Sequence, residues 1–191
     1  MQAKALNTRR KLRCLALGLA LAAGLALAAP ANAQAADGPA VATAQRADAA
    51  LDPRAAMGRA FGQEELDNGK FLWKDGTTQV DRLLLRLTEQ LIYAYDDDEL
   101  VAVSTVSTGR KGYETRTGSF TIMAKYRRYD SKKYDNAPMT FMQQITRYGV
   151  ALHAGSLPGY PASHGCIRLP NQFAAQLFEA TKIGTPVVVT E

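Results

Sequence analysis

Cysteine, histidine and tryptophan are scarce in this sequence, at two, two and one among 191 residues. Only Cys166 lies beyond the N-terminal apolar segment that holds Cys14, so the chain without that segment can form no internal disulfide. This excludes the disulfide-rich secreted scaffolds. Apolar residues make up 47% and charged residues 21%, which excludes fibrous and wholly disordered classes. The length predicts one domain with extensions.

Positive and negative charges are balanced in the chain beyond residue 33. Residues 1–33 carry five basic side chains and no acidic ones, whereas the rest of the chain carries 18 of each. The net charge of +5 therefore comes from the N-terminal segment alone. Bulk charge gives no support to nucleic-acid binding, and we predict no nucleic-acid partner.

The sequence further lacks an apolar run with the length of a membrane span. The run Cys14–Ala29 follows a basic start and is shorter than the about 20 residues that cross a bilayer. Small residues then occupy both positions of an A-x-A cleavage site that ends at Ala33. We predict a signal peptide over residues 1–33, export to the periplasm or cell envelope, and no stable membrane span after cleavage. An uncleaved membrane anchor is the alternative.

The next segment has few large apolar side chains. Alanine fills 11 of the 27 positions in residues 34–60, so this stretch has little to bury in a core. We predict a linker or N-terminal extension over residues 34–80, with a frayed helix as the alternative for its first part, and a folded domain over residues 81–191.

Short strand-like runs begin near residue 80. In residues 82–87, leucines alternate onto one face while two arginines flank Leu84 on the other. An amphipathic helix is predicted to begin at Asn171 and to end before Gly184. The predicted fold class is mainly β, with one helix in the C-terminal half packed on it. The predicted strands are 82–87, 91–95 and 100–106, as an antiparallel meander with an acidic turn, and 119–123, 149–153 and 186–190.

Two histidines and one cysteine gather within 14 positions, as His153, His164 and Cys166. His153 closes a predicted strand, and the Gly- and Pro-rich loop after it can bring its imidazole beside Cys166. A free thiol, with a pKa of about 8.5, is little ionised at neutral pH, so an imidazole that takes its proton activates it as a nucleophile. The same imidazole can return the proton to a leaving amine, and Gly165 lets backbone N–H groups approach an oxyanion.

Two other interpretations of this cluster remain open. Two histidines and one cysteine could hold a zinc ion with one open position, although the spacing H-x10-H-x-C fits no motif we can justify. The cluster could also be structural, with Cys166 buried and inert.

The motif at residues 163–166, Ser-His-Gly-Cys, with a His-x-Gly at residues 153–155, resembles the signature of the L,D-transpeptidases, the YkuD-type catalytic domain. The similarity extends over about residues 82–190. The sequence departs from the family's pattern in two ways. Only nine residues separate His153 from Ser163, and Arg116 stands where the family usually has proline. Weaker similarities to family loops lie at residues 107–109, 115–120 and 138–141.

The resemblance implies a β-sandwich or barrel-type catalytic domain that acts on peptidoglycan stem peptides. By similarity, Cys166 is the nucleophile and His153 its base, oriented by the carbonyl of Ala154. Arg168 would bind substrate carboxylates. Supporting and oxyanion roles would fall to Ser163, His164 and Gly165.

The implied reaction passes through an acyl-enzyme that an amine acceptor resolves, and it needs no metal or organic cofactor. A hydrolase that uses the same Cys–His site is the alternative, and a non-catalytic wall-binding module is a third reading. The linkage formed and the oligomeric state stay open.

Residues 110–133 carry eight basic residues against two acidic ones. This segment could form a cleft wall that attracts anionic stem peptides, or a solvated loop without a ligand. Tyr126, Tyr129 and Tyr134 could line a lid or simply pack.

Overall fold

The computed structural model describes residues 52–134 and 136–191. The predicted signal peptide and the alanine-rich residues up to 51 lie outside the described residues. Two helices and ten strands make up the described part. In chain order they are α2 (Pro53–Phe61), β1 (Phe71–Trp73), β2 (Arg82–Arg86), β3 (Leu91–Asp96), β4 (Glu99–Thr105), β5 (Gly118–Thr121), β6 (Ala124–Tyr126), β7 (Met142–Gln144), β8 (Ala151–Ala154), β9 (Ile167–Leu169), α3 (Asn171–Ala180) and β10 (Pro186–Thr190).

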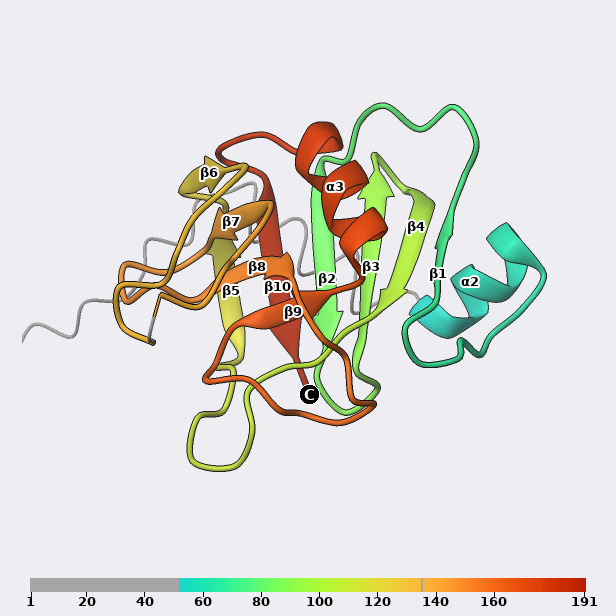
Figure 1. Cartoon of the computed structure of the whole chain (residues 1–191). Helices are drawn as coiled ribbons and strands as arrows, with labels where there is room; N and C mark the ends of the chain where they lie inside the picture. Colours follow the sequence, from blue (N-terminus) through green and yellow to red (C-terminus); the bar gives the residue numbers. More distant parts are fainter. Residues whose placement is uncertain (1–51, 135) are drawn as a thin grey trace, which may run out of the picture. The chain divides into compact units, whose positions relative to one another are not determined.

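The strands form a six-stranded sheet in the order β1-β4-β3-β2-β10-β5 and a four-stranded sheet in the order β6-β7-β8-β9 (Figure 1). The predicted antiparallel meander is confirmed as β2, β3 and β4. Its second turn consists of Asp97 and Asp98, and Asp97 takes a left-handed φ of 52°, as tight hairpin turns require. Strand β10, the last in the chain, pairs in parallel with β2, so the C-terminal end of the chain lies inside the large sheet.

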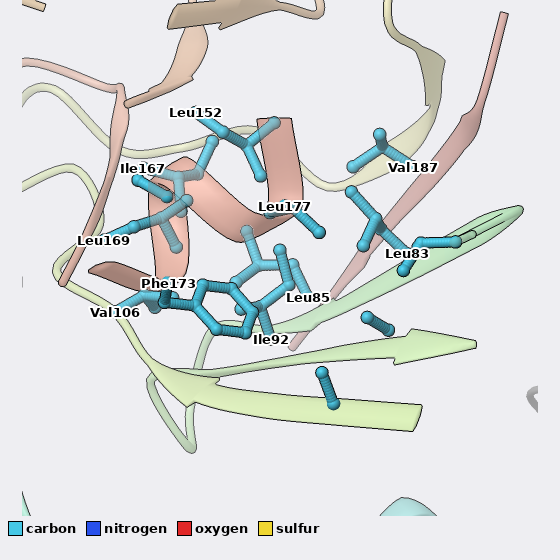
Figure 2. Packing of buried hydrophobic residues seen from close by; sticks show 14 of the residues in the cluster. Leu83, Leu85, Ile92, Val106, Leu152, Ile167, Leu169, Phe173, Leu177 and Val187 are labelled. Carbon is cyan, nitrogen blue, oxygen red and sulfur yellow. The ribbon is translucent and has the colours of Figure 1, made fainter. Parts of the chain in front are cut away.

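The main core lies between the two sheets and is completed by α3. Phe173 and Leu177 of α3 are fully buried between the leucines of β2 on one side and the small sheet on the other (Figure 2). Burial of each such side chain stabilises the fold by about 1.5–3 kcal/mol. The buried residues that Figure 2 labels are Leu83, Leu85, Ile92, Val106, Leu152, Ile167, Leu169, Phe173, Leu177 and Val187.

The outer face of the large sheet is apolar too, and α2 packs against it. Leu84 of β2, on the face where the sequence places it between two arginines, is only 3% exposed. It belongs to a second buried cluster with Tyr93, Val103 and Met57 of α2. The described part of residues 34–80 thus includes a helix and, in β1, an edge strand of the sheet. Although residues 34–60 have few large apolar side chains, Met57 of α2 is fully buried, so the described end of this stretch contributes to the core.

Helix α3 begins at Asn171 as predicted and ends at Ala180, where Thr181 is extended. Four three-residue strands, β1, β6, β7 and β9, were not predicted. Within residues 52–134 and 136–191, none of the helices has the length and apolar character needed to cross a membrane.

Candidate active site

Strands β8 and β9 bring the two ends of the predicted site together. They pair in parallel with Leu152 opposite Ile167 and His153 opposite Arg168. Leu152 and Ile167 are fully buried in the core, so His153 and Arg168, one position further along, point to the other side. Cys166 directly precedes β9. The side chains of His153, Cys166 and Arg168 line one cavity of about 520 Å³.

The orientation of His153 is fixed by its own strand. The side chain is 8% exposed, and its Nδ1 lies 2.8 Å from the carbonyl oxygen of Ala154. A carbonyl oxygen only accepts hydrogen bonds, so Nδ1 carries the proton and Nε2 keeps a lone pair. The imidazole is thereby held in the tautomer of a general base.

The turn before β9 is built around Ser163. Its buried hydroxyl donates to the carbonyl of Cys166 at 2.6 Å and accepts the N–H of Gly165 at 3.0 Å. Gly165 has a φ of +106°, which favours glycine. Its N–H stabilises the turn and is not free for an oxyanion. The N–H groups of His164 and Cys166 donate no hydrogen bond to the described residues.

A neighbouring loop holds this turn from outside. Thr115 donates a 3.0 Å hydrogen bond to the carbonyl of Gly165 and accepts the N–H of Gly109. Ser107 exchanges two backbone hydrogen bonds with Arg168, each 3.0 Å long. The segments at residues 107–109 and 115–120, noted in the sequence only as loop similarities, therefore support the cysteine.

Burial sets the resting charge of the cysteine–histidine pair. Desolvation raises the pKa of the Cys166 thiol, although the Ala151 backbone and the charges of Arg168 and Lys133 oppose this. Desolvation also lowers the pKa of His153. The hydrogen bond to Ala154 opposes this, and the charge of Arg168 adds to it. At neutral pH both groups are therefore uncharged, and the imidazole is free to accept the thiol proton.

The side chain of His164 packs among aromatic rings. Its ring stacks on Tyr134 at 4.5 Å and meets the edge of Tyr113 at 4.7 Å. The Arg110 guanidinium lies over Tyr113, and the Lys133 ammonium lies over Tyr134. Sequence reasoning gave no role to Tyr113, because one exposed tyrosine in a loop carries no pattern of its own.

A second, larger cavity of about 820 Å³ adjoins the first. Cys166, His164 and Tyr134 line both cavities, Gly165 lines only the larger one, and His153 only the smaller one. In the described part of the chain, no three His, Cys, Asp or Glu side chains gather where they could hold a metal ion. The zinc interpretation therefore lacks a set of protein ligands among these residues.

Comparison with known proteins gives a consistent family assignment. A curated protein of Mycobacterium tuberculosis, Probable L,D-transpeptidase 3, is 30% identical in an alignment of 105 positions that covers 47% of this chain and 39% of that protein. A crystal structure of an L,D-transpeptidase from Stackebrandtia nassauensis aligns with a TM-score of 0.56 and 25% identity, covering 67% of this chain and 62% of that one.

A structure of L,D-transpeptidase 3 from Mycobacterium tuberculosis, in complex with a faropenem-derived adduct, aligns with a TM-score of 0.53 and 25% identity, covering 57% of this chain and 59% of that one. This chain spans less than two thirds of the length of each of these three relatives. The model of the L,D-transpeptidase catalytic domain family, YkuD, matches residues 80–189, more than half of the sequence. The chain therefore belongs to the L,D-transpeptidase catalytic domain family.

Proposed function

We propose that this protein is an exported L,D-transpeptidase that uses Cys166 as its nucleophile and cross-links peptidoglycan stem peptides. The observation that carries the proposal is the pairing of β8 with β9, which puts Cys166 and His153 on one cavity wall with Nε2 of the imidazole unprotonated. Export rests on the predicted signal peptide over residues 1–33, and the substrate class rests on the family.

The reaction takes place in two steps at the sulfur. The thiol gives its proton to His153, Sγ attacks the carbonyl carbon of the donor peptide, and the oxyanion takes hydrogen bonds from the N–H groups of His164 and Cys166. The C–N bond breaks, and His153 returns the proton to the departing amine. An acceptor amine then loses a proton to His153 and attacks the thioester carbon, the C–S bond breaks, and His153 returns the proton to the departing sulfur. No metal or organic cofactor enters either step.

The decisive test is covalent labelling of the cysteine. Because a relative was solved with a faropenem-derived adduct, we expect faropenem to form a covalent adduct with this protein. Intact-protein mass spectrometry should show one adduct, with peptide mapping placing it on Cys166 and Cys166→Ala abolishing it. His153→Ala should slow adduct formation by roughly 100-fold or more, the usual contribution of a general base. An unlabelled thiol in folded, reduced protein would contradict the proposal.

Product analysis separates transfer from hydrolysis at the same site. Incubation with purified disaccharide-tetrapeptides should give cross-linked dimers, detected by chromatography and mass spectrometry. Trimmed monomers alone would identify a hydrolase. Sacculus remodelling that survives in Cys166→Ala protein would instead favour a wall-binding module.

A further inference from the structure

The two cavities meet at the sulfur but differ in their access to the base. Cys166 lines both, whereas His153 lines only the cavity of about 520 Å³. We call this the base-side cavity and the one of about 820 Å³ the basic cavity, after the charges described below. Any group that exchanges a proton with His153 must therefore lie on the base side.

In the proposed reaction, two amines of the substrates exchange a proton with His153, in addition to the thiol itself. The departing amine receives it when the C–N bond breaks, and the acceptor amine gives it up when it attacks the thioester carbon. Both steps happen at the same carbon, and the second is the reverse of the first with a different amine. Both amines therefore occupy the base-side cavity in turn, and the acyl part that stays bound to sulfur extends into the other cavity.

The charges of that other cavity are strongly one-sided. Its lining includes Arg116, Lys132, Lys133 and Arg147, against a single carboxylate, Glu114. Glu114 accepts the N–H of Gly112 at 2.7 Å, and backbone hydrogen bonds keep its pKa low. The base-side cavity has one fixed cation, Arg168.

In the part of the chain that the structure describes, the four cations of the basic cavity are not paired with a carboxylate. They come from three separate loops, before β5, between β6 and β7, and between β7 and β8. Three loops that each direct cations to one hollow beside the nucleophile create a positive field there that favours an anionic ligand.

We infer that the basic cavity holds the acyl part of an acidic donor peptide, and that Arg116, Lys132, Lys133 and Arg147 select donors with free carboxylates in that part. The inference rests on the proposed function. It adds the cavity in which each part of the donor peptide lies and the carboxylates by which donors are selected. The base-side cavity takes the departing and incoming amines, with Arg168 placed to meet a carboxylate beside them.

The experiment compares two donors in the mature protein. Both are tetrapeptides that end in D-alanine, one with free side-chain and internal carboxylates and one with these groups amidated. The variant is Lys132→Glu/Arg147→Glu, and the matched control is Arg128→Glu, an exposed cation of the same segment that lines neither cavity. Alkylation of Cys166 by iodoacetamide, which is uncharged, monitors the nucleophile, and release of D-alanine measures acylation.

For the free-acid donor we expect the double variant to lower kcat/KM by about tenfold, mainly through KM, because two attractive charges become repulsive. The amidated donor and the iodoacetamide rate should change by less than about twofold, and Arg128→Glu should behave as wild type. An equal loss with both donors, no loss with either, or the same loss in Arg128→Glu would overturn the inference. A wild-type protein that neither donor acylates would overturn the proposed function itself, and this inference with it.

Discussion

At the scale of single residues, burial leaves the reacting groups uncharged, and hydrogen bonds hold the residues around them in place. The hydroxyls of Ser163 and Thr115 form hydrogen bonds with the backbone of the turn around Gly165. These bonds fix the turn before Cys166 and do not involve the sulfur atom. Ala154 fixes the proton of His153 on Nδ1. The pKa of the thiol is raised and the pKa of the imidazole is lowered, so both groups are neutral at rest. We therefore expect the proton to move from the thiol to the imidazole during the attack, rather than beforehand to give a preformed ion pair.

This arrangement predicts the pH dependence of faropenem acylation. His153 must be unprotonated to act, and burial lowers its pKa below the ordinary 6.5. The acylation rate should therefore decline as the pH falls, with a midpoint below 6.5. Stopped-flow or mass-spectrometric rates over pH 4.5–8 would measure it.

The control for that profile is His164→Phe, because His164 is the other imidazole in the base-side cavity. The phenyl ring can keep the stack on Tyr134, so the midpoint should not move even if the rate changes. A midpoint at or above 6.5, or one that disappears in His164→Phe, would assign the titration to a different group.

At the scale of secondary structure elements, α2 shows how an alanine-rich segment joins a core. Met57 is its one large, fully buried side chain, and Arg54 adds an ion pair to Glu89 at the end of the β2–β3 turn. Asp52 caps the helix by accepting the N–H of Arg54, and Gly62 ends it in a left-handed conformation. The helix is short, so its packing on the sheet maintains it.

We therefore expect Met57→Ala to destabilise the whole domain. Loss of a fully buried methionine leaves a cavity that costs about 2–5 kcal/mol of unfolding free energy. Urea unfolding of the wild type and the variant would measure this. Arg59→Ala, an exposed position on the same helix, should lie within about 0.5 kcal/mol of wild type. Equal stability of Met57→Ala and wild type would mean that α2 is an appendage rather than part of the fold.

The strands that could be predicted from the sequence are those long enough to show a repeating pattern of apolar side chains. β2, β3 and β10 have five or six residues each, and their alternating or β-branched patterns place them within one or two residues. β1, β6, β7 and β9 have three residues each, which is too short for any period to appear. The parallel pairing of β10 with β2 joins residues about 100 positions apart, so no local signal could indicate it.

The same distinction applies to the site. His153 and Cys166 stand out because their residue types are scarce and their chemistry is specific. Three of the four cations of the basic cavity, Arg116, Lys132 and Lys133, belong to the basic segment 110–133 that the sequence marks as a possible cleft wall. The sequence does not show that three loops converge on one cavity, or that Arg147 joins these cations there.

At the scale of the whole molecule, one apolar core joins the small sheet that bears His153 to the β1 edge of the large sheet. Leu177 of α3 is fully buried in the cluster that also contains residues of β2 and β8. Trp73, the single tryptophan, lies in β1 and packs edge-on against Phe173 of the same helix at 5.6 Å. Cys166 lies next to β9 and packs against a smaller buried cluster of Met139, Met142 and Ala151. Tryptophan fluorescence and thiol reactivity therefore report on different parts of the domain.

A single core predicts that these two probes change together during unfolding. In urea, Trp73 fluorescence and Cys166 alkylation should give the same midpoint, as a two-state domain requires. Leu177→Ala should shift both midpoints downward to the same extent, corresponding to about 2–5 kcal/mol, whereas Gln172→Ala on the exposed side of α3 should shift neither. Separate midpoints would show that the sheet bearing the nucleophile unfolds independently of the β1 edge. In that case the active site would owe its geometry to the small sheet and its loops, and α3 would be a boundary between two units instead of the element that unites them.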